Sequence, residues 1–171
     1  ALAVVAVCLV GHPLAGQSNP MTIVDLIEVP SVSDVRFSPD GQHSLFVRGE
    51  ADWDANQTIA HVWRVDMAGG DPIQLTNGAE GESSPRWSPD GTRIAFIAER
   101  GEDEAAQVHL LNTAGGEAQP LTDHPTAVSS IEWSPDGEWI YFLAADEKTE
   151  RQKARDEAQD DVFAFDENWE Q

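Results

Sequence analysis

The tetrapeptide Ser-Pro-Asp-Gly occupies residues 38–41 and recurs at residues 88–91 and 134–137. The second copy begins 50 residues after the first, and the third begins 46 residues after the second. Two dipeptide markers also return after 46 residues: Gly69-Gly70 as Gly115-Gly116, and Leu75-Thr76 as Leu121-Thr122. Because three markers keep one order along the chain, we infer that the chain is built from repeats of a single structural unit.

Each repeat is predicted to be a set of short strands. Pro in the tetrapeptide presets φ for a type I turn, and Gly supplies the left-handed residue, which predicts a three-residue hairpin. The segments before the hairpins each end in an aromatic residue, and those after them are rich in β-branched and aromatic residues. The predicted strands are residues 35–37, 85–87 and 131–133 before the hairpins, 43–48, 93–98 and 138–144 after them, and 60–65 and 107–111 as third strands. A Gly-Gly turn and a short fourth strand ending in Leu-Thr complete a unit.

Four strands in a repeat of about 45 residues are typical of a β-propeller blade. The predicted fold class is all-β, a partial β-propeller with two complete four-stranded blades, the start of a third and one short helical insertion. The predicted domain covers residues 33–171, with blades at about 33–76 and 83–122 and an incomplete blade at 128–171. A β-sandwich is the alternative, but sandwiches do not normally repeat one turn sequence at one spacing. Closed propellers have about 4–8 blades, so we expect the isolated chain to fold marginally.

Two segments lie outside the strand pattern. Residues 17–32 form a lead-in to the first blade. Residues 146–160 are charged throughout and rich in helix-favouring side chains, which predicts a short exposed helix inserted in the third blade; a solvated spacer is the alternative. Residues 161–165 resume an extended pattern.

The first ten residues form an unbroken apolar run, which is too short to span a bilayer. Helix breakers and small residues follow it, as in a secretory signal peptide. We therefore expect residues 1–16 to be a signal peptide truncated at its start, and the protein to be exported, periplasmic or secreted, with no stable membrane span after cleavage. A short buried helix or strand is the alternative. Cys8, the only cysteine, lies in this run, so no thiol chemistry is expected in the mature protein.

The charge of the chain restricts its partners. Its 31 acidic and 10 basic residues give a formal net charge of −21. Such a field repels phosphate backbones, which excludes nucleic acid as an expected partner. A salty habitat and ordinary solubility both remain open as reasons for the acidity.

No residue is predicted to be catalytic, to bind a cofactor or to hold a metal. Residues 52–56 faintly resemble a calcium loop, but such a loop needs Gly at its sixth position and Glu at its twelfth, where this chain has Gln57 and Trp63. A polar loop between strands is the interpretation. The histidines show no ligand spacing; they are His12, His43, His61, His109 and His124.

Two other patterns have a plain structural alternative. Residues 56–58 have the form of an N-glycosylation acceptor, which matters only in a host that glycosylates. Trp87 and Trp133 could stack on a ligand, but their fixed place before each hairpin favours a role in packing the blades.

The chain resembles the prolyl oligopeptidase family of serine peptidases along nearly its whole length. Residues 21–26, 30–34 and 37–41 are similar to the opening of exported members, especially the dipeptidyl or acylaminoacyl peptidase branch. Residues 62–76 are similar to the first blade of that group and residues 86–96 to the second. Residues 153–169 resemble the insertion that those enzymes carry before their next strand.

This resemblance implies a propeller that caps a C-terminal α/β-hydrolase domain of the same chain with a Ser, Asp, His triad, and that restricts entry to short peptides. The 171 residues contain no Gly-x-Ser-x-Gly elbow, so the catalytic residues are expected beyond this N-terminal fragment. One alternative is a non-catalytic periplasmic propeller like the Tol-system scaffold, which places an α/β domain before its propeller. Another is a propeller that binds glycans or peptides without catalysis.

Overall fold

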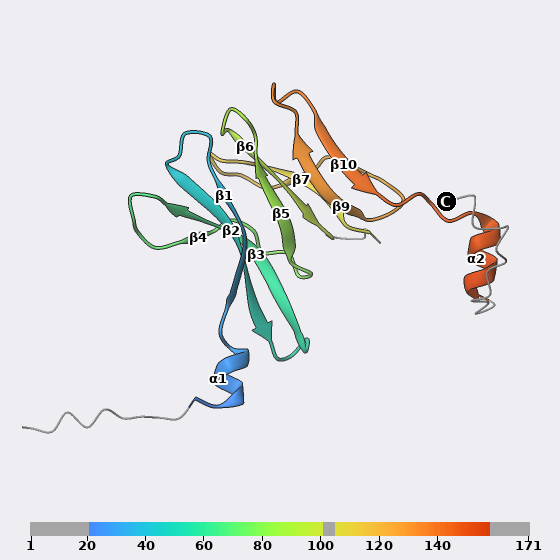
Figure 1. The fold of residues 1–171 in the computed structure, drawn as a ribbon, viewed down its shortest axis with the longest axis horizontal. Coiled ribbons are helices and arrows are strands. Elements are labelled where there is room, and N and C mark those ends of the chain that lie inside the picture. Colours follow the sequence, from blue (N-terminus) through green and yellow to red (C-terminus); the bar gives the residue numbers. More distant parts are fainter. Residues whose placement is uncertain (1–20, 101–104, 158–171) are drawn as a thin grey trace, which may run out of the picture.

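The computed structural model describes residues 21–100 and 105–157, which form three antiparallel sheets and two short helices (Figure 1). The first sheet is β1 (Ser31–Phe37), β2 (His43–Asp52), β3 (Gln57–Asp66) and β4 (Ile73–Gln74). The second is β5 (Glu82–Trp87), β6 (Arg93–Ala98), β7 (Gln107–Asn112) and β8 (Gln119–Pro120). The third is β9 (Val128–Trp133) and β10 (Ile140–Ala144), and the helices are α1 (Ile23–Ile27) and α2 (Glu150–Glu157).

The predicted fold class is confirmed. Two sheets have four strands each, in chain order, and the third sheet has the first two strands of the same pattern. Figure 1 shows the three sheets following one another in the order of the sequence colours. The strands β2 and β3 are longer than predicted because their pairing continues to Asp52 and Gln57.

The hairpin loops differ from the prediction in length. Ser38 N–H donates to the His43 carbonyl at 2.8 Å, so four residues rather than three separate the closing pair. The Ser38 carbonyl accepts instead from Gly41 N–H at 2.9 Å, and the Ser38 hydroxyl accepts the His43 N–H at 2.9 Å. The serine side chain therefore takes the place of its own carbonyl in the ladder. The same bonds recur at Ser88 and Ser134.

A buried hydroxyl and an exposed carboxylate hold each hairpin together. Ser88, which is fully buried, donates its hydroxyl to Asp90 at 2.6 Å, and Asp90 also accepts the Thr92 N–H at 3.0 Å. The Ser88 hydroxyl and then the Thr92 groups lower the pKa of Asp90 to about 2. Because the folded pKa is below the ordinary 3.8, Asp90 stabilises the fold above about pH 4 and loses this contribution as pH falls toward 2.

We predict that Ser88→Ala raises the pKa of Asp90 toward its ordinary value of 3.8, because the Ser88 hydroxyl is the largest cause of the lowering. The measurement is an NMR titration of the Asp90 carboxyl carbon. Asp136, which is held by Ser134 in the third hairpin, is the internal control and keeps its lowered pKa. An unchanged titration of Asp90 in the variant would contradict the assignment.

The first strands of the complete sheets each carry a bulge. The register shifts between Ser33 and Arg36 in β1 and between Ser83 and Arg86 in β5. Residues inside the bulges adopt left-handed backbone, with φ of 46° at Asp34 and 53° at Ser84. Bulges bend a strand and re-aim its side chains, and here they precede Arg36, which pairs with Asp34 on its own strand, and Arg86, which reaches both neighbouring sheets.

The core consists of two interfaces between successive sheets, which we call the first and second seams. At the first seam, Leu45 and Val62 of the first sheet pack against β6 and β7 of the second, including Phe96, which is fully buried. At the second seam, Val108 and its neighbours pack against Val128 and Ile131 of β9. Because β6 contributes alternate residues to the two seams, each of its faces is buried, as in a sheet covered on both sides.

The run from 139 to 143 is apolar at every position, a pattern typical of a strand that is covered on both faces. In the described part of the chain only one face is covered, by the second sheet, and Tyr141 and Leu143 are 63% and 67% exposed. The reason is that no described sheet lies on the other side of β10.

Both helices begin with a capping box. Before α1, the Thr22 hydroxyl accepts the Asp25 N–H and the Asp25 carboxylate accepts the Thr22 N–H. This helix was not predicted in the lead-in segment. Thr149 and Gln152 do the same before α2, which lies inside the predicted insertion. Neither described helix is long and apolar enough to cross a membrane. The predicted signal peptide and the extended pattern at 161–165 lie outside the described residues.

Candidate functional site

A row of charged side chains crosses the first strands of all three sheets. These strands, β1, β5 and β9, lie side by side. The Arg86 guanidinium on β5 lies 3.0 Å from the Asp34 carboxylate on β1 and 3.4 Å from the Glu132 carboxylate on β9. Arg36 pairs with Asp34 at 2.7 Å. Because the row joins the first strands of three successive sheets, it is a candidate surface for contact with a ligand.

The two tryptophans before the hairpins connect neighbouring sheets. The Trp87 indole donates to the Arg36 carbonyl across the first seam at 3.2 Å, and the Trp133 indole donates to the Arg86 carbonyl across the second seam at 3.2 Å. Both rings are half-buried and pack against the seam cores. Trp133 also lines a cavity of about 520 Å³, where the Arg93 guanidinium lies 5.0 Å from its ring centroid.

A buried carboxylate joins the first two sheets. The side chain of Glu82, at the start of β5, is fully buried. It accepts the Gly78 N–H at 2.7 Å and the Arg100 guanidinium at 2.6 Å, and it lies 2.9 Å from Nδ1 of His61 on β3. Burial opposes ionisation, but hydrogen bonds from His61, Thr76, Gly78 and Arg100 outweigh it and hold the pKa of Glu82 below its usual value. We call Glu82, His61 and Arg100 the clasp.

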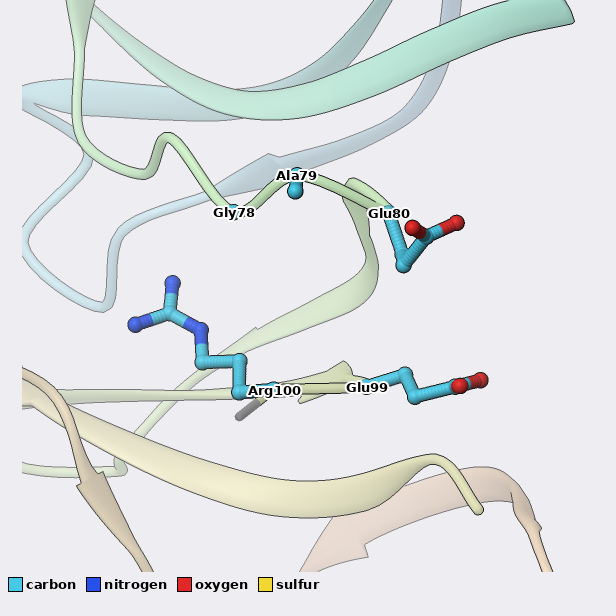
Figure 2. A pocket seen from close by; sticks show the side chains of 5 residues that line it. All are labelled: Gly78, Ala79, Glu80, Glu99 and Arg100. Atoms are coloured by element: carbon cyan, nitrogen blue, oxygen red, sulfur yellow. The ribbon is translucent and has the colours of Figure 1, made fainter. Parts of the chain in front are cut away.

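A polar cavity of about 310 Å³ lies beside the clasp (Figure 2). Its lining residues are Gly78, Ala79, Glu80, Glu99 and Arg100. Figure 2 shows the Glu80 and Glu99 carboxylates on the same side of the cavity, with the Arg100 guanidinium turned the other way. The lining offers charge and hydrogen bonds but no serine, cysteine or lysine nucleophile, so these five residues provide no acyl-transfer chemistry.

The calcium-loop-like residues 52–56 and the glycosylation pattern at residues 56–58 lie at the β2–β3 turn. The Asp52 carboxylate accepts the N–H groups of Asp54 and Ala55 at 2.9 and 3.0 Å and so caps the β2–β3 turn. Asn56, the first residue of the glycosylation pattern, is exposed in that turn with φ of 51°. Within residues 21–100 and 105–157, no three His, Cys, Asp or Glu side chains lie close enough together to hold a metal.

The described histidines are spread over the sheets. His43 lies 3.5 Å from the Asp66 carboxylate, His61 belongs to the clasp, and His109 stacks on Phe96 with ring centroids 5.7 Å apart. His124 meets the edge of Phe142. His12 lies outside the described residues.

Sequence reasoning missed the clasp and the charged row. One signal was present in the repeats: Glu82 stands six residues before its hairpin serine, where the third repeat has Val128. A carboxylate at a position that is apolar in the next copy marks a local change of function or packing. The row of Asp34, Arg86 and Glu132 had no signal, because its residues meet only when the sheets are placed side by side.

Comparison with known proteins relates this propeller to peptidases. A model of the WD domain, G-beta repeat, matches residues 116–149. The chain is 34% identical to the uncharacterized peptidase YuxL of Bacillus subtilis over 92 residues, which are 54% of this chain and 14% of that protein. It is 31% identical to dipeptidyl-peptidase 5 of Porphyromonas gingivalis over 70 residues, which are 41% of this chain and 10% of that protein.

Solved structures support the propeller fold, among them a peptidase domain. The β-propeller domain of the trilobed protease from Pyrococcus furiosus matches with a TM-score of 0.52 and 20% identity, over 66% of this chain and 34% of that one. The chain has a propeller fold and is similar in sequence to parts of two peptidases. It spans only a small part of the length of the curated relatives that it matches.

Proposed function

We propose that the chain is the N-terminal propeller part of an exported serine peptidase of the prolyl oligopeptidase family. The observation that carries the proposal is the sequence similarity of the chain to two relatives that are named peptidases. The apolar run at residues 1–10 supports export.

In this proposal the propeller limits which peptides reach an α/β-hydrolase domain in the same chain. That domain cleaves short peptides by acyl transfer through a Ser nucleophile, which a His activates and an oxyanion hole assists. The first strands contribute charged groups, Asp34, Arg86 and Glu132, to the wall of the channel. In this proposal a folded protein is too wide to enter the channel, whereas a short extended peptide enters it.

The test is labelling of the full-length gene product with a fluorophosphonate, which reacts with an activated serine. We expect one labelled serine in a Gly-x-Ser-x-Gly elbow, and loss of both labelling and hydrolysis of short aminoacyl nitroanilides when that serine is changed to Ala. Folded full-length protein with no labelled serine would overturn the peptidase proposal and favour a non-catalytic scaffold. Labelled protein that hydrolyses long and short peptides equally well would overturn the filtering role alone.

A further inference from the structure

Equivalent hydrogen-bond donors at the two seams, a threonine hydroxyl and a backbone N–H, are bound by different acceptors. At the second seam, the Gln107 amide oxygen accepts the Thr122 hydroxyl at 2.7 Å and the His124 N–H at 3.0 Å, and its NH₂ donates to the His124 carbonyl at 2.8 Å. All three residues belong to the second sheet and the loop that follows it. This amide network is neutral and does not cross the seam.

At the first seam the acceptor comes from the neighbouring sheet. Thr76 and Gly78 occupy the places of Thr122 and His124, 46 residues earlier, but they donate to Glu82 of the second sheet. His61, which stands where the second repeat has Gln107, also turns to Glu82. The fully buried Glu82 carboxylate therefore ties the first sheet to the second.

We propose that the first seam is the opening point of this propeller: the clasp of Glu82, His61 and Arg100 closes it and releases on acidification, whereas the second seam stays shut. This inference goes beyond the proposed peptidase function and does not depend on it.

The reason lies in the donors that surround the carboxylate. Arg100, Gly78 and Thr76 donate to Glu82. Because an ionised carboxylate can only accept, Nδ1 of His61 must also donate to it, so every contact needs an acceptor. A protonated Glu82 turns one of its oxygens into a donor that faces another donor. Breaking one side of a buried charged pair is strongly unfavourable, so the seam gains by opening to water.

The charged groups around the clasp come from both sheets. His61 extends from β3 and Arg100 follows β6, and the Glu80 and Glu99 carboxylates line the cavity on which Arg100 borders. Because Glu82 ionises more readily than its ordinary pKa of 4.5 predicts, its contribution is complete above pH 4.5 and is lost as the pH falls below that value.

Two kinds of contact recur across both seams, and the second seam also has a bond from the Val128 N–H to the Ala106 carbonyl at 2.8 Å. Each seam has one indole-to-carbonyl bond, from Trp87 or Trp133, and one contact of the Arg86 guanidinium with a carboxylate. Val128, 3% exposed, occupies the place of Glu82 at the second seam. Glu82 is the fully buried carboxylate among these ion pairs, whereas the Asp34 and Glu132 side chains are 22% and 72% exposed, so the difference between the seams in acid is assigned to the clasp.

The strand β6 offers a matched pair of probes. Ala98 faces the first seam and Ala95 faces the second, and they are 3% and 0% exposed. Single Ala98→Cys and Ala95→Cys variants of the full chain carry a Cys8→Ser change, which removes the only native cysteine. Dithiodipyridine, which reacts with thiols in acid, reports how often each seam opens. Rates are divided by that of an exposed Ala114→Cys variant at the same pH.

We expect the relative rate at position 98 to rise by up to about tenfold between neutral pH and about pH 3.5, since a carboxyl that regains its ordinary pKa of 4.5 on opening favours the open state by at most that factor one pH unit lower. The rate at position 95 should change far less. With Glu82→Gln added, position 98 should react fast already at neutral pH and lose its pH dependence. Equal increases at both positions, or a Glu82→Gln variant that behaves like its parent, would overturn the proposal.

A second variant transplants the neutral network into the first seam. His61→Gln with Glu82→Val gives the first seam the residues of the second at both positions. We expect the cysteine at position 98 to react slowly in acid. The neutral side-chain amide introduced at position 61 of the first sheet then accepts from Thr76 and Gly78. A retained acid response in this variant would show that another group controls the seam, and would reject the clasp.

Discussion

Phe96→Ala is expected to lower the free energy of unfolding by about 3–5 kcal/mol, the usual cost of removing a fully buried phenylalanine. The ring is 0% exposed in the core of the first seam, stacks on His109 and lies 5.2 Å beneath the Arg100 guanidinium. Its loss opens a cavity between two sheets that cannot close without moving the clasp. Urea unfolding followed by circular dichroism measures the change.

Phe142→Ala is the matched control. Phe142 stands eight residues after the start of its tetrapeptide, as Phe96 does, but it is 39% exposed in the third sheet. We expect a clearly smaller loss, because less apolar area returns to water. Equal losses in the two variants would contradict the packing described for the first seam.

Gly81→Ala is expected to give the second large effect. Gly81 has φ of +82°, and a Cβ at this position would lie 2.7 Å from the Ala60 carbonyl oxygen and 3.0 Å from the Ala60 nitrogen. Left-handed backbone costs an alanine about 1–2 kcal/mol, and the clash with the backbone of β3 should add about 1–3 kcal/mol, as overpacking does. The same urea unfolding experiment measures the sum.

Gly41→Ala separates the two contributions. Gly41 has a similar φ of +69°, but a Cβ there meets nothing within 4 Å. Only the backbone cost is expected in this variant. If Gly41→Ala and Gly81→Ala prove equally harmful, the first seam is looser than its contacts indicate.

The strands were predictable because their signals are local. Pro39 and Gly41 determine the turn from within a tetrapeptide, and the aromatic residues before it mark the end of a strand. The length of the hairpin loop was not predictable from these residues. It depends on the Ser38 hydroxyl, which takes the His43 N–H in place of the carbonyl, and a turn pattern does not reveal that choice.

The clasp could not be predicted from the sequence for a different reason. His61 precedes Glu82 by 21 residues and Arg100 follows it by 18, so the three meet only after two sheets have docked. Each residue alone looks like an ordinary surface charge. The five-residue helix α1 was missed because it is shorter than the window in which helical periodicity can be recognised, although Thr22 and Asp25 form a capping box.

The indole bonds of Trp87 and Trp133 both run from a later sheet to an earlier one. Each seam thus has a donor on the later sheet and an acceptor on the earlier sheet. These roles cannot be exchanged, so the sheets follow one another in a single rotational sense. A whole unit such as the second could therefore be duplicated, because its indole and its Arg86 carbonyl would find the complementary group on either neighbour. Inverting the order of units, or cutting one in the middle, would leave a donor facing no acceptor.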